Sequence, residues 1–411
     1  MTTVREPYEL YEPYRGLLTT LADDAIPLTL LDEAARRCGW WHSHRPWQRT
    51  YGRFHMGDCH LLTLIYETLD GPQEICVIDL FTSFPRTFDP LQTVFRRAGL
   101  GWFCLTRFPH DPHLPALPQL LRPAVGEAKV LRYRPHKRCT IRFSGLAEGA
   151  PSAGLVGESC FAKHFPDERG AELHAESVAL WQASRRGELS FAVAPPIRWD
   201  EAQQTLWQGV VPGRPVVERL LSNEGPTLAN QIGRAAASLP CAALQPSQRG
   251  DAQKQLKRSA RYAQRLADFF PNLRPALNLL MDRLVTIHAG VEEHPLRPIH
   301  GAPHPHQWLD DNGRLGLVDF DGFALGDPEL DVATFMAEMD FEDWERVPVA
   351  AINRAFQAGY EAVYGPLDPH LLNAYRAHKR LSKALRNAYA IRGDNDMRVE
   401  RALGQALVLV C

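Results

Sequence analysis

The apolar positions in the first part of the chain are grouped into short runs separated by turn-forming residues. They predict, in order, a helix over Ile26–Cys38 and strands over His60–Glu67, Glu74–Phe81 and Gly101–Phe108. The turn sequence Leu69-Asp70-Gly71-Pro72 lies between the first two strands and predicts a hairpin. The aromatic and basic segment Trp40–Arg53 precedes the predicted strands, and its apolar residues follow neither a helix nor a strand period. The N-terminal part therefore reads as mixed α and β.

A second pattern begins at Lys129 and gives way to helices after residue 211. It predicts strands over Val130–Tyr133, Thr140–Phe143 and Ser159–Phe165, a helix over Arg169–Ser184, and strands over Ala192–Trp199 and Gln204–Val211. The Val211-Pro212-Gly213-Arg214-Pro215 segment then breaks the pattern. Beyond it the apolar period is mainly helical and is interrupted only near residues 297–330, where Leu315–Val318 reads as a strand.

These changes in pattern divide the 411 residues into three parts. Residues 1–120 form an N-terminal extension, which ends in the proline-rich segment Pro109–Pro123. Residues 121–211 form a small lobe of strands with one helix, and residues 212–411 form a large helical lobe.

Charge and cysteine usage narrow the range of partners. The net charge is -2, from 46 basic and 48 acidic residues, so we expect neither nucleic acid nor an anionic membrane as a partner. No apolar run is long enough for a membrane span, and the N-terminus lacks the apolar core of a signal peptide. The eight scattered cysteines show no metal-binding spacing, which predicts reduced thiols in a cytoplasmic protein.

The segment Ile299–Phe335 carries the candidate chemistry. Phosphoryl transfer requires a positioned nucleotide, one or two Mg²⁺ ions and an oriented acceptor hydroxyl. Kinases supply these from a His-x-Asp-x-x-x-x-Asn loop and a following strand that ends in a second Asp. Here His300 opens the loop, but Ala302 stands at the position of the catalytic Asp and Gln307 at that of the Asn. Asp319 ends the following strand.

Three motifs occur in this order: His-Gly-x-x-His-Pro-x-x-x-Leu from His300, Val-Asp-Phe-Asp ending at Asp321, and Gly-Asp-Pro-Glu-Leu-Asp ending at Asp331. Together they resemble the aminoglycoside-phosphotransferase and choline-kinase family over about residues 125–400. The resemblance implies an α+β fold of the two-lobed protein-kinase type, with a small antiparallel β lobe and a large helical lobe behind the N-terminal α/β extension. It implies ATP and Mg²⁺ as cofactors and a hydroxyl-bearing acceptor, either a small molecule or a peptide.

The same resemblance suggests a role for individual residues. Asp319 would ligate Mg²⁺, with Gln307 as a second oxygen ligand one methylene further out. Lys163 would contact the α- and β-phosphates, with Glu176, or Glu172 one turn earlier, as its helix partner. Residues of the Tyr133–Thr140 hairpin would add positive charge over the phosphates: Arg134, Lys137 and Arg138. Asp331 is expected to brace the loop through His300 or its backbone amides.

Alanine can neither accept a proton nor orient a hydroxyl, and three explanations of Ala302 stay open. In the first explanation the protein is a working phosphotransferase. Either another side chain serves as the base, with Asp321 and His304 as the nearest alternatives, or transfer relies on positioning and the metal ion alone. In the second explanation it is a degenerate kinase, which binds a nucleotide or a partner protein as a scaffold but transfers no phosphoryl group. In the third explanation the residue is a deliberate substitution for Asp.

Other functional classes lack their motifs. The chain contains neither the Gly-x-Ser-x-Gly elbow of serine hydrolases nor the Gly-x-Gly-x-x-Gly turn of dinucleotide-binding enzymes. An acidic run, Glu338–Glu345, follows the Asp331 helix and leaves two interpretations, a contact surface for a cationic acceptor or a solvated helix face.

Overall fold

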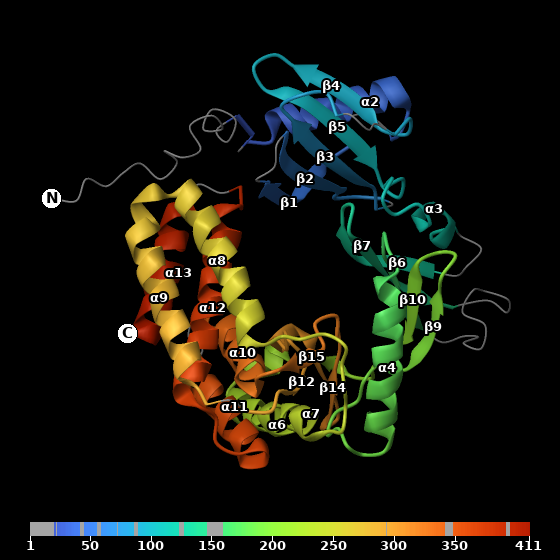
Figure 1. The fold of residues 1–411 in the computed structure, drawn as a ribbon. Helices are drawn as coiled ribbons and strands as arrows, with labels where there is room; N and C mark the ends of the chain where they lie inside the picture. Colours follow the sequence, from blue (N-terminus) through green and yellow to red (C-terminus); the bar gives the residue numbers. More distant parts are fainter. Residues whose placement is uncertain are drawn as a thin grey trace.

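The computed structural model describes most residues of the chain. These are residues 20–21, 23–41, 45–55, 59–71, 73–85, 89–122, 127–145, 159–292, 294–341, 348–391 and 395–411. Figure 1 shows a β-sheet at the N-terminal end, a second sheet with one long helix beside it, and a group of helices that forms the rest of the molecule. No helix in these ranges is long and apolar enough to cross a membrane.

The N-terminal part is a helix, α2 (Ala25–Cys38), with a five-stranded antiparallel sheet in the order β1-β2-β3-β5-β4. Its strands are β1 (Trp47–Phe54), β2 (His60–Thr68), β3 (Ile75–Phe81), β4 (Thr93–Arg97) and β5 (Gly101–Arg107). The predicted hairpin is confirmed, because β2 and β3 pair antiparallel from His60–Phe81 to Glu67–Ile75. The sequence did not predict β1, whose side chains are mostly half-buried or exposed, or β4, which is only five residues long.

The second sheet is also antiparallel and five-stranded, in the order β6-β7-β8-β10-β9. Its elements are β6 (Glu127–Arg134), β7 (Arg138–Ser144), β8 (Cys160–His164), α4 (Arg169–Arg185), β9 (Pro196–Asp200) and β10 (Thr205–Gly209). The predicted order of three strands, one helix and two strands is confirmed. Strand β9 begins later than expected, and Ala192 forms a bridge to Gly316 instead, because Pro195 and Pro196 have no N–H to donate to a ladder.

The remainder is mainly helical, as predicted, with short strands around the motif segment. The helices are α5 (Val217–Leu220), α6 (Gly225–Ala236), α7 (Ser238–Cys241), α8 (Ala252–Phe269), α9 (Arg274–Gly290), α10 (Pro328–Phe341), α11 (Val349–Tyr364), α12 (Pro369–Ala388) and α13 (Asn395–Val410), with 3₁₀ turns η3 (Pro271–Leu273) and η4 (Pro305–Gln307). The strands are β11 (Arg214–Pro215), β12 (Arg297–Ile299), β13 (Trp308–Asp311), β14 (Arg314–Leu317) and β15 (Ala324–Gly326).

The N-terminal sheet contributes to two separate hydrophobic cores. Leu62 and Leu64 of β2 lie in a core that continues through α8, α9, α12 and α13. Ile65 of the same strand and Ile75 of β3 lie in a second core with β7, β8 and Trp207 of β10. Successive residues of a strand point to opposite faces, so one sheet can serve both cores. In Figure 1 the sheet accordingly lies above both the helical group and the second sheet.

The proline-rich segment before the second sheet is packed against it. It contains a short helix, α3 (Leu117–Leu120), and the buried Leu114, which belongs to the core shared with the second sheet. The proposed boundaries near residues 120 and 211 stay predictions, because the chain remains in close contact across the first of them. All eight cysteines lie within the described ranges and are free.

A half-buried histidine also joins the two sheets. His136 lies in the turn between β6 and β7 with φ +62°, a left-handed conformation that histidine adopts more readily than most residues. Its Nε2 lies 3.1 Å from Asp79 Oδ2 of β3, and its Nδ1 lies 3.2 Å from Asp111 Oδ1. Both carboxylates are buried. Burial alone would lower the pKa of His136, but the hydrogen bonds to Asp111 and Asp79 outweigh it and raise the pKa to about 10.

This contact predicts a pH-dependent contribution to stability. A histidine whose pKa is raised from 6.5 stabilises the fold fully below about pH 6.5 and loses that contribution as the pH rises towards 10. The pKa of Asp79 is held below its usual range, so its contribution is present above about pH 4 and is lost in more acidic solution. His136→Asn should therefore lower the free energy of unfolding by about 2–4 kcal/mol at pH 6 and by clearly less at pH 9.5. Urea unfolding at the two pH values measures this, with His110→Asn, an exposed site, as the control. An equal loss at both values would contradict it.

Candidate nucleotide site

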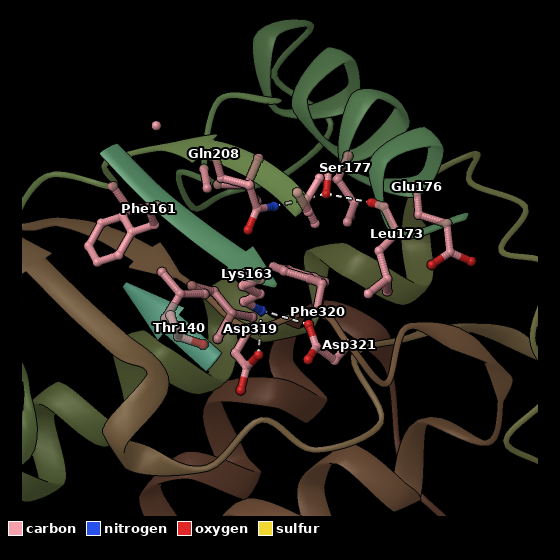
Figure 2. Close-up of a pocket in the computed structure, with 18 of the residues that line it drawn as sticks. Thr140, Phe161, Lys163, Leu173, Glu176, Ser177, Gln208, Asp319, Phe320 and Asp321 are labelled. Carbon is pink, nitrogen blue, oxygen red and sulfur yellow. Dashed lines mark hydrogen bonds and ion pairs between the residues drawn. The ribbon is translucent and has the colours of Figure 1, made fainter. Parts of the chain in front are cut away.

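A pocket of about 310 Å³ lies between the second sheet and the helical part. One part of its wall is apolar and includes Phe161, Leu206, Val211, Leu309 and Leu317. The other part carries charges from Arg138, Lys163, Asp319 and Asp321. Figure 2 shows Lys163 reaching from its strand towards the two aspartates. An apolar slot that ends in charged groups suits a flat aromatic base with a charged tail.

Lys163 and two aspartates join the two sides of this pocket. Lys163 Nζ lies 2.7 Å from Asp319 Oδ1 and 2.6 Å from Asp321 Oδ1. Burial lowers the pKa of Lys163, and the charge and hydrogen bond of Asp319 offset part of that effect. Burial would raise the pKa of Asp319, but Lys163 and then Arg138 outweigh it and hold the pKa well below its usual range. Lys163 and Asp319 are thus both charged and in contact across the pocket.

The helix partner expected for Lys163 is engaged elsewhere. Glu176 Oε1 accepts hydrogen bonds from the backbone N–H and the hydroxyl of Ser247 at 3.3 and 3.1 Å. Glu172 accepts from Gln248. Glu176 still lines the pocket, but Figure 2 shows its carboxylate pointing away from Lys163. Asp319 and Asp321 supply the negative charge beside Lys163 that the sequence led us to expect from a glutamate of α4.

Of the three basic residues predicted over the phosphates, Arg138 is the one that lines the pocket. It pairs with Asp321, and its second terminal nitrogen lies 3.9 Å from Asp319 Oδ2. Arg134 and Lys137 are exposed and lie outside the pocket lining. Burial, followed by repulsion from Arg132 and Arg138, lowers the pKa of Arg134 to about 10. Arg132, which the sequence analysis did not select, does line the pocket.

The loop that begins at His300 is braced from inside the helical part. Asp331 of α10 accepts hydrogen bonds from the backbone N–H groups of His300 and Gly301 at 2.7 and 2.8 Å, which confirms the predicted bracing. His300 is buried, and burial lowers its pKa to about 4, so the ring is neutral at pH 7. Its Nε2 donates to Val318 O at 3.1 Å, which leaves Nδ1 to accept from the Ala302 N–H at 3.4 Å. With both nitrogens engaged, His300 shapes the loop and does not face a substrate.

At Ala302 the loop keeps its backbone hydrogen bonding, although the alanine side chain cannot act as a base. The Ala302 carbonyl accepts a hydrogen bond from the His304 N–H at 2.9 Å. The pKa of His304 is lowered by burial, and its buried Nδ1 has no hydrogen-bond partner within the described chain. Asp321, the other replacement base that the sequence suggested, instead faces Lys163 and Arg138. The two candidates therefore lie in different environments.

Gln307 does not present a free carbonyl to a metal. Its Oε1 accepts from the His304 N–H at 3.0 Å, and its Nε2 faces Asp319 Oδ2 at 3.4 Å. That orientation of the amide follows from the backbone donor, which requires an oxygen. Gln307 thus supports Asp319 by donating to it, whereas the sequence led us to expect a metal ligand. The oxygen ligand that could accompany Asp319 at a metal ion is therefore Asp321, whose carboxylate contacts the same lysine.

The donor set fits Mg²⁺ only in combination with a bound phosphate. No group of three or more His, Cys, Asp or Glu side chains within the described chain is arranged to hold a metal ion. Asp319 and Asp321 nevertheless meet on one cation, Lys163. Mg²⁺ in kinase sites is commonly held by one or two carboxylates together with substrate phosphates and water. Arg138 Nε is in addition a buried donor without a partner here, as expected of a group directed at an anion.

The backbone of Asp319 is itself unusual. Its φ is +69°, in the left-handed region that residues other than glycine seldom occupy. Such conformations cost on the order of 1–3 kcal/mol and are concentrated at functional sites. The turn aims the Asp319 carboxylate into the pocket just after β14 ends at Leu317. This observation comes from the structure alone, since Val-Asp-Phe-Asp has no turn-forming glycine at that position.

The acidic run after α10 does not form a free negative surface in its described part. Glu338 pairs with Arg386 at 3.2 Å. Asp340 pairs with Arg376 at 3.3 Å and with Arg380 at 2.8 Å. Glu342, Asp343 and Glu345 lie outside the described residues. The two carboxylates that are described thus fasten α10 to α12 and give no support for a cationic acceptor.

Comparison with known proteins identifies the family. A family model described as the phosphotransferase enzyme family matches residues 157–370, which is more than half of the chain. The chain belongs to this family. A search of curated proteins finds no match for this chain.

The chain is similar in fold to solved structures of kinases. The choline kinase from Cryptosporidium parvum has a TM-score of 0.50 at 11% identity, over 73% of this chain and 92% of that one. The choline kinase LicA from Streptococcus pneumoniae has a TM-score of 0.47 at 15% identity, over 71% and 95% of the two chains. At such identities the likeness concerns the fold alone. The family assignment and the similarity to the Cryptosporidium parvum structure confirm the kinase-like architecture that the motifs predicted.

Several lining residues were within reach of the sequence. Phe161 and Lys163 are two residues apart on β8, and Arg138 and Thr140 are two apart on β7, so each pair shares a strand face. Applying this period from Lys163 outwards would have selected Phe161. Gln208 and Val211, at and beyond the end of β10, carry no comparable signal, because their place in the pocket depends on how the sheet meets the helical part.

The loop geometry predicts that Gly301 cannot be replaced. Its φ is +82°, and a Cβ would lie 2.3 Å from the carbonyl oxygen of Gly322. Gly313 has a similar φ of +93° but open space around it. Gly301→Ala should therefore lower the free energy of unfolding by about 2–4 kcal/mol, and Gly313→Ala by about 1 kcal/mol, which isolates the steric part. Urea titration measures both, and equal losses would mean that the contact with Gly322 can relax.

Proposed function

We propose that this protein binds ATP with Mg²⁺ in the pocket around Lys163 and transfers a phosphoryl group to a hydroxyl-bearing acceptor. The observation that carries the proposal is the contact of one buried lysine with two carboxylates, Asp319 and Asp321, at the charged end of an apolar pocket. Lys163 and Arg138 together balance the charge of the two carboxylates. Two carboxylates beside two cations, at the end of an apolar pocket, are the groups that a metal–phosphate unit would use.

The roles of the charged residues follow from their chemistry. Lys163 is a compact cation suited to phosphate oxygens, and Arg138 adds a planar donor whose Nε is free for an anion. Asp319 and Asp321 would hold Mg²⁺, which neutralises charge that develops on the phosphoryl oxygens. The apolar wall that includes Phe161 and Leu206 would take the base. Gln307 would orient Asp319 through its amide N–H.

Ala302 separates two versions of this function. In the first, the protein transfers phosphate slowly, because positioning and charge neutralisation remain while the base is missing. In the second, it is a nucleotide-binding scaffold that performs no transfer. Membership of the phosphotransferase enzyme family supports the first version. The bracing by Asp331, whose pKa burial raises to about 6, keeps the shape of the loop in either version. The acceptor is a small molecule or a peptide.

Nucleotide binding should depend on Asp319. Titration calorimetry should detect ATP binding that requires Mg²⁺ and that weakens by at least about tenfold in Asp319→Asn, because the metal loses a charged ligand. Asp282→Asn, at an exposed position of α9, is the matched control and should bind as the unaltered protein does. Binding that is insensitive to both Mg²⁺ and Asp319→Asn would contradict the proposed site.

Restoring the base should raise turnover. A positioned general base contributes about 10²–10⁴-fold, or roughly 3–5 kcal/mol of barrier, so Ala302→Asp should increase the rate of transfer from labelled ATP by up to that factor. Ala302→Asn has nearly the same shape without a base and should leave the rate low. The ATP affinity of both variants should stay unchanged. If the unaltered protein is already fast and Ala302→Asp is no faster, another group acts as the base, and Asp321 and His304 are the next residues to substitute.

A further inference from the structure

His136 connects the N-terminal sheet with the hairpin that carries Arg138. The turn between β6 and β7 places His136 two residues before Arg138. Asp111 accepts from the His136 backbone N–H at 2.8 Å, from its ring Nδ1, and from the Tyr133 hydroxyl at 2.8 Å. The hairpin is thus held on strand β6 and at its tip by one carboxylate that belongs to the segment after β5.

The second carboxylate comes from the interior of the N-terminal sheet. Asp79 is 2% exposed and accepts from His136 Nε2, from His60 Nε2 at 3.0 Å and from the Thr63 hydroxyl. Both ring nitrogens of His136 therefore face carboxylate oxygens, so both must carry protons and the ring is an imidazolium. A cation held between two buried carboxylates has a strongly preferred geometry, because removing it leaves both carboxylates without the positive charge that they share.

We propose that His136, held by Asp79 and Asp111, is a positioning residue that fixes the β6–β7 hairpin and thereby places Arg138 for the phosphates of the nucleotide. The N-terminal extension is on this view a working part of the nucleotide site. This inference rests on the proposed nucleotide-binding function. It adds a role for three residues that lie outside the pocket lining and belong to none of the three motifs.

The physical reason is the cost of ordering an exposed hairpin. Arg134 is repelled by Arg132 and Arg138 of the same hairpin, and Arg134 and Lys137 are exposed. A free hairpin would fluctuate, and Arg138 would lose conformational freedom each time a nucleotide bound. The contacts of His136 fix the turn before binding. Preorganisation of this kind improves affinity without adding a contact to the ligand.

The test is a double-mutant cycle on ATP affinity measured by calorimetry in the full chain with Mg²⁺. His136→Asn removes the charge but tolerates the left-handed backbone, so the turn is not strained by the substitution. Alone, it should weaken ATP binding by about tenfold. Arg138→Met should also weaken binding, and adding His136→Asn to it should cause a further change of less than about twofold, because His136 acts through Arg138.

Two further measurements separate positioning from a loss of folding. His110→Asn, an exposed histidine of the segment that contains Asp111, is the matched control and should bind ATP normally. His136→Gly should bind weakly and should recover affinity when imidazole is added at pH 6. A cavity of about 960 Å³, whose wall includes His60, Asp79, His113 and His136, gives the added ring access to the position of the His136 side chain beside Asp79. Recovery requires a folded acceptor site and would not follow from mere destabilisation.

The outcomes distinguish this inference from the proposed function. If the unaltered protein binds no ATP, the proposed function fails and the inference fails with it. If the unaltered protein binds ATP in an Asp319-dependent manner but His136→Asn binds equally well, the inference alone is overturned. The inference is also overturned if His136→Asn lowers ATP affinity by the same factor in the unaltered protein and in Arg138→Met. His136 would then act on binding independently of Arg138.

Discussion

The contact of Lys163 with Asp319 and Asp321 is the constraint on which the arrangement of the molecule depends. It joins a strand of the second sheet to the turn after β14, and so sets the distance between the small and the helical parts. Three charged side chains taken out of water would be unfavourable if they did not face one another. The sheet, the unusual backbone of Asp319 and the support from Gln307 all serve to bring these groups together.

The N-terminal sheet adds a second connection between the same two parts. One face contributes to the core of the helical group and the other to the core of the second sheet, so the extension contacts both sides of the pocket region. His136 continues this connection to the hairpin beside the pocket. Relative movement of the two parts would have to disturb two packed cores, which restrains such movement more than a single flexible hinge would.

Ala302 changes the chemistry of the loop more than its shape. The loop keeps its bracing by Asp331, the neutral His300 and the sterically required Gly301. Phosphoryl transfer depends largely on positioning and electrostatics, so a loop of this shape without a base is compatible with slow transfer. For the same reason the structure of the loop by itself does not distinguish a slow enzyme from a binding protein, whereas the turnover of Ala302→Asp does.

The sequence by itself determined the family, the order of elements and the positions of Lys163, Asp319 and Asp331, because strand and helix periods and short motifs are local properties. It missed β1 and β4, whose burial depends on neighbouring strands, and it paired Lys163 with Glu176 because helix position alone does not define a contact. Only the tertiary structure showed that Asp321 takes the second place at the lysine, that the Gln307 carbonyl is already used by His304, and that His136 reaches Asp79 of another sheet. Each of these depends on which side chains come into contact when segments distant in the sequence pack together. The pattern of residues along one chain does not specify such contacts.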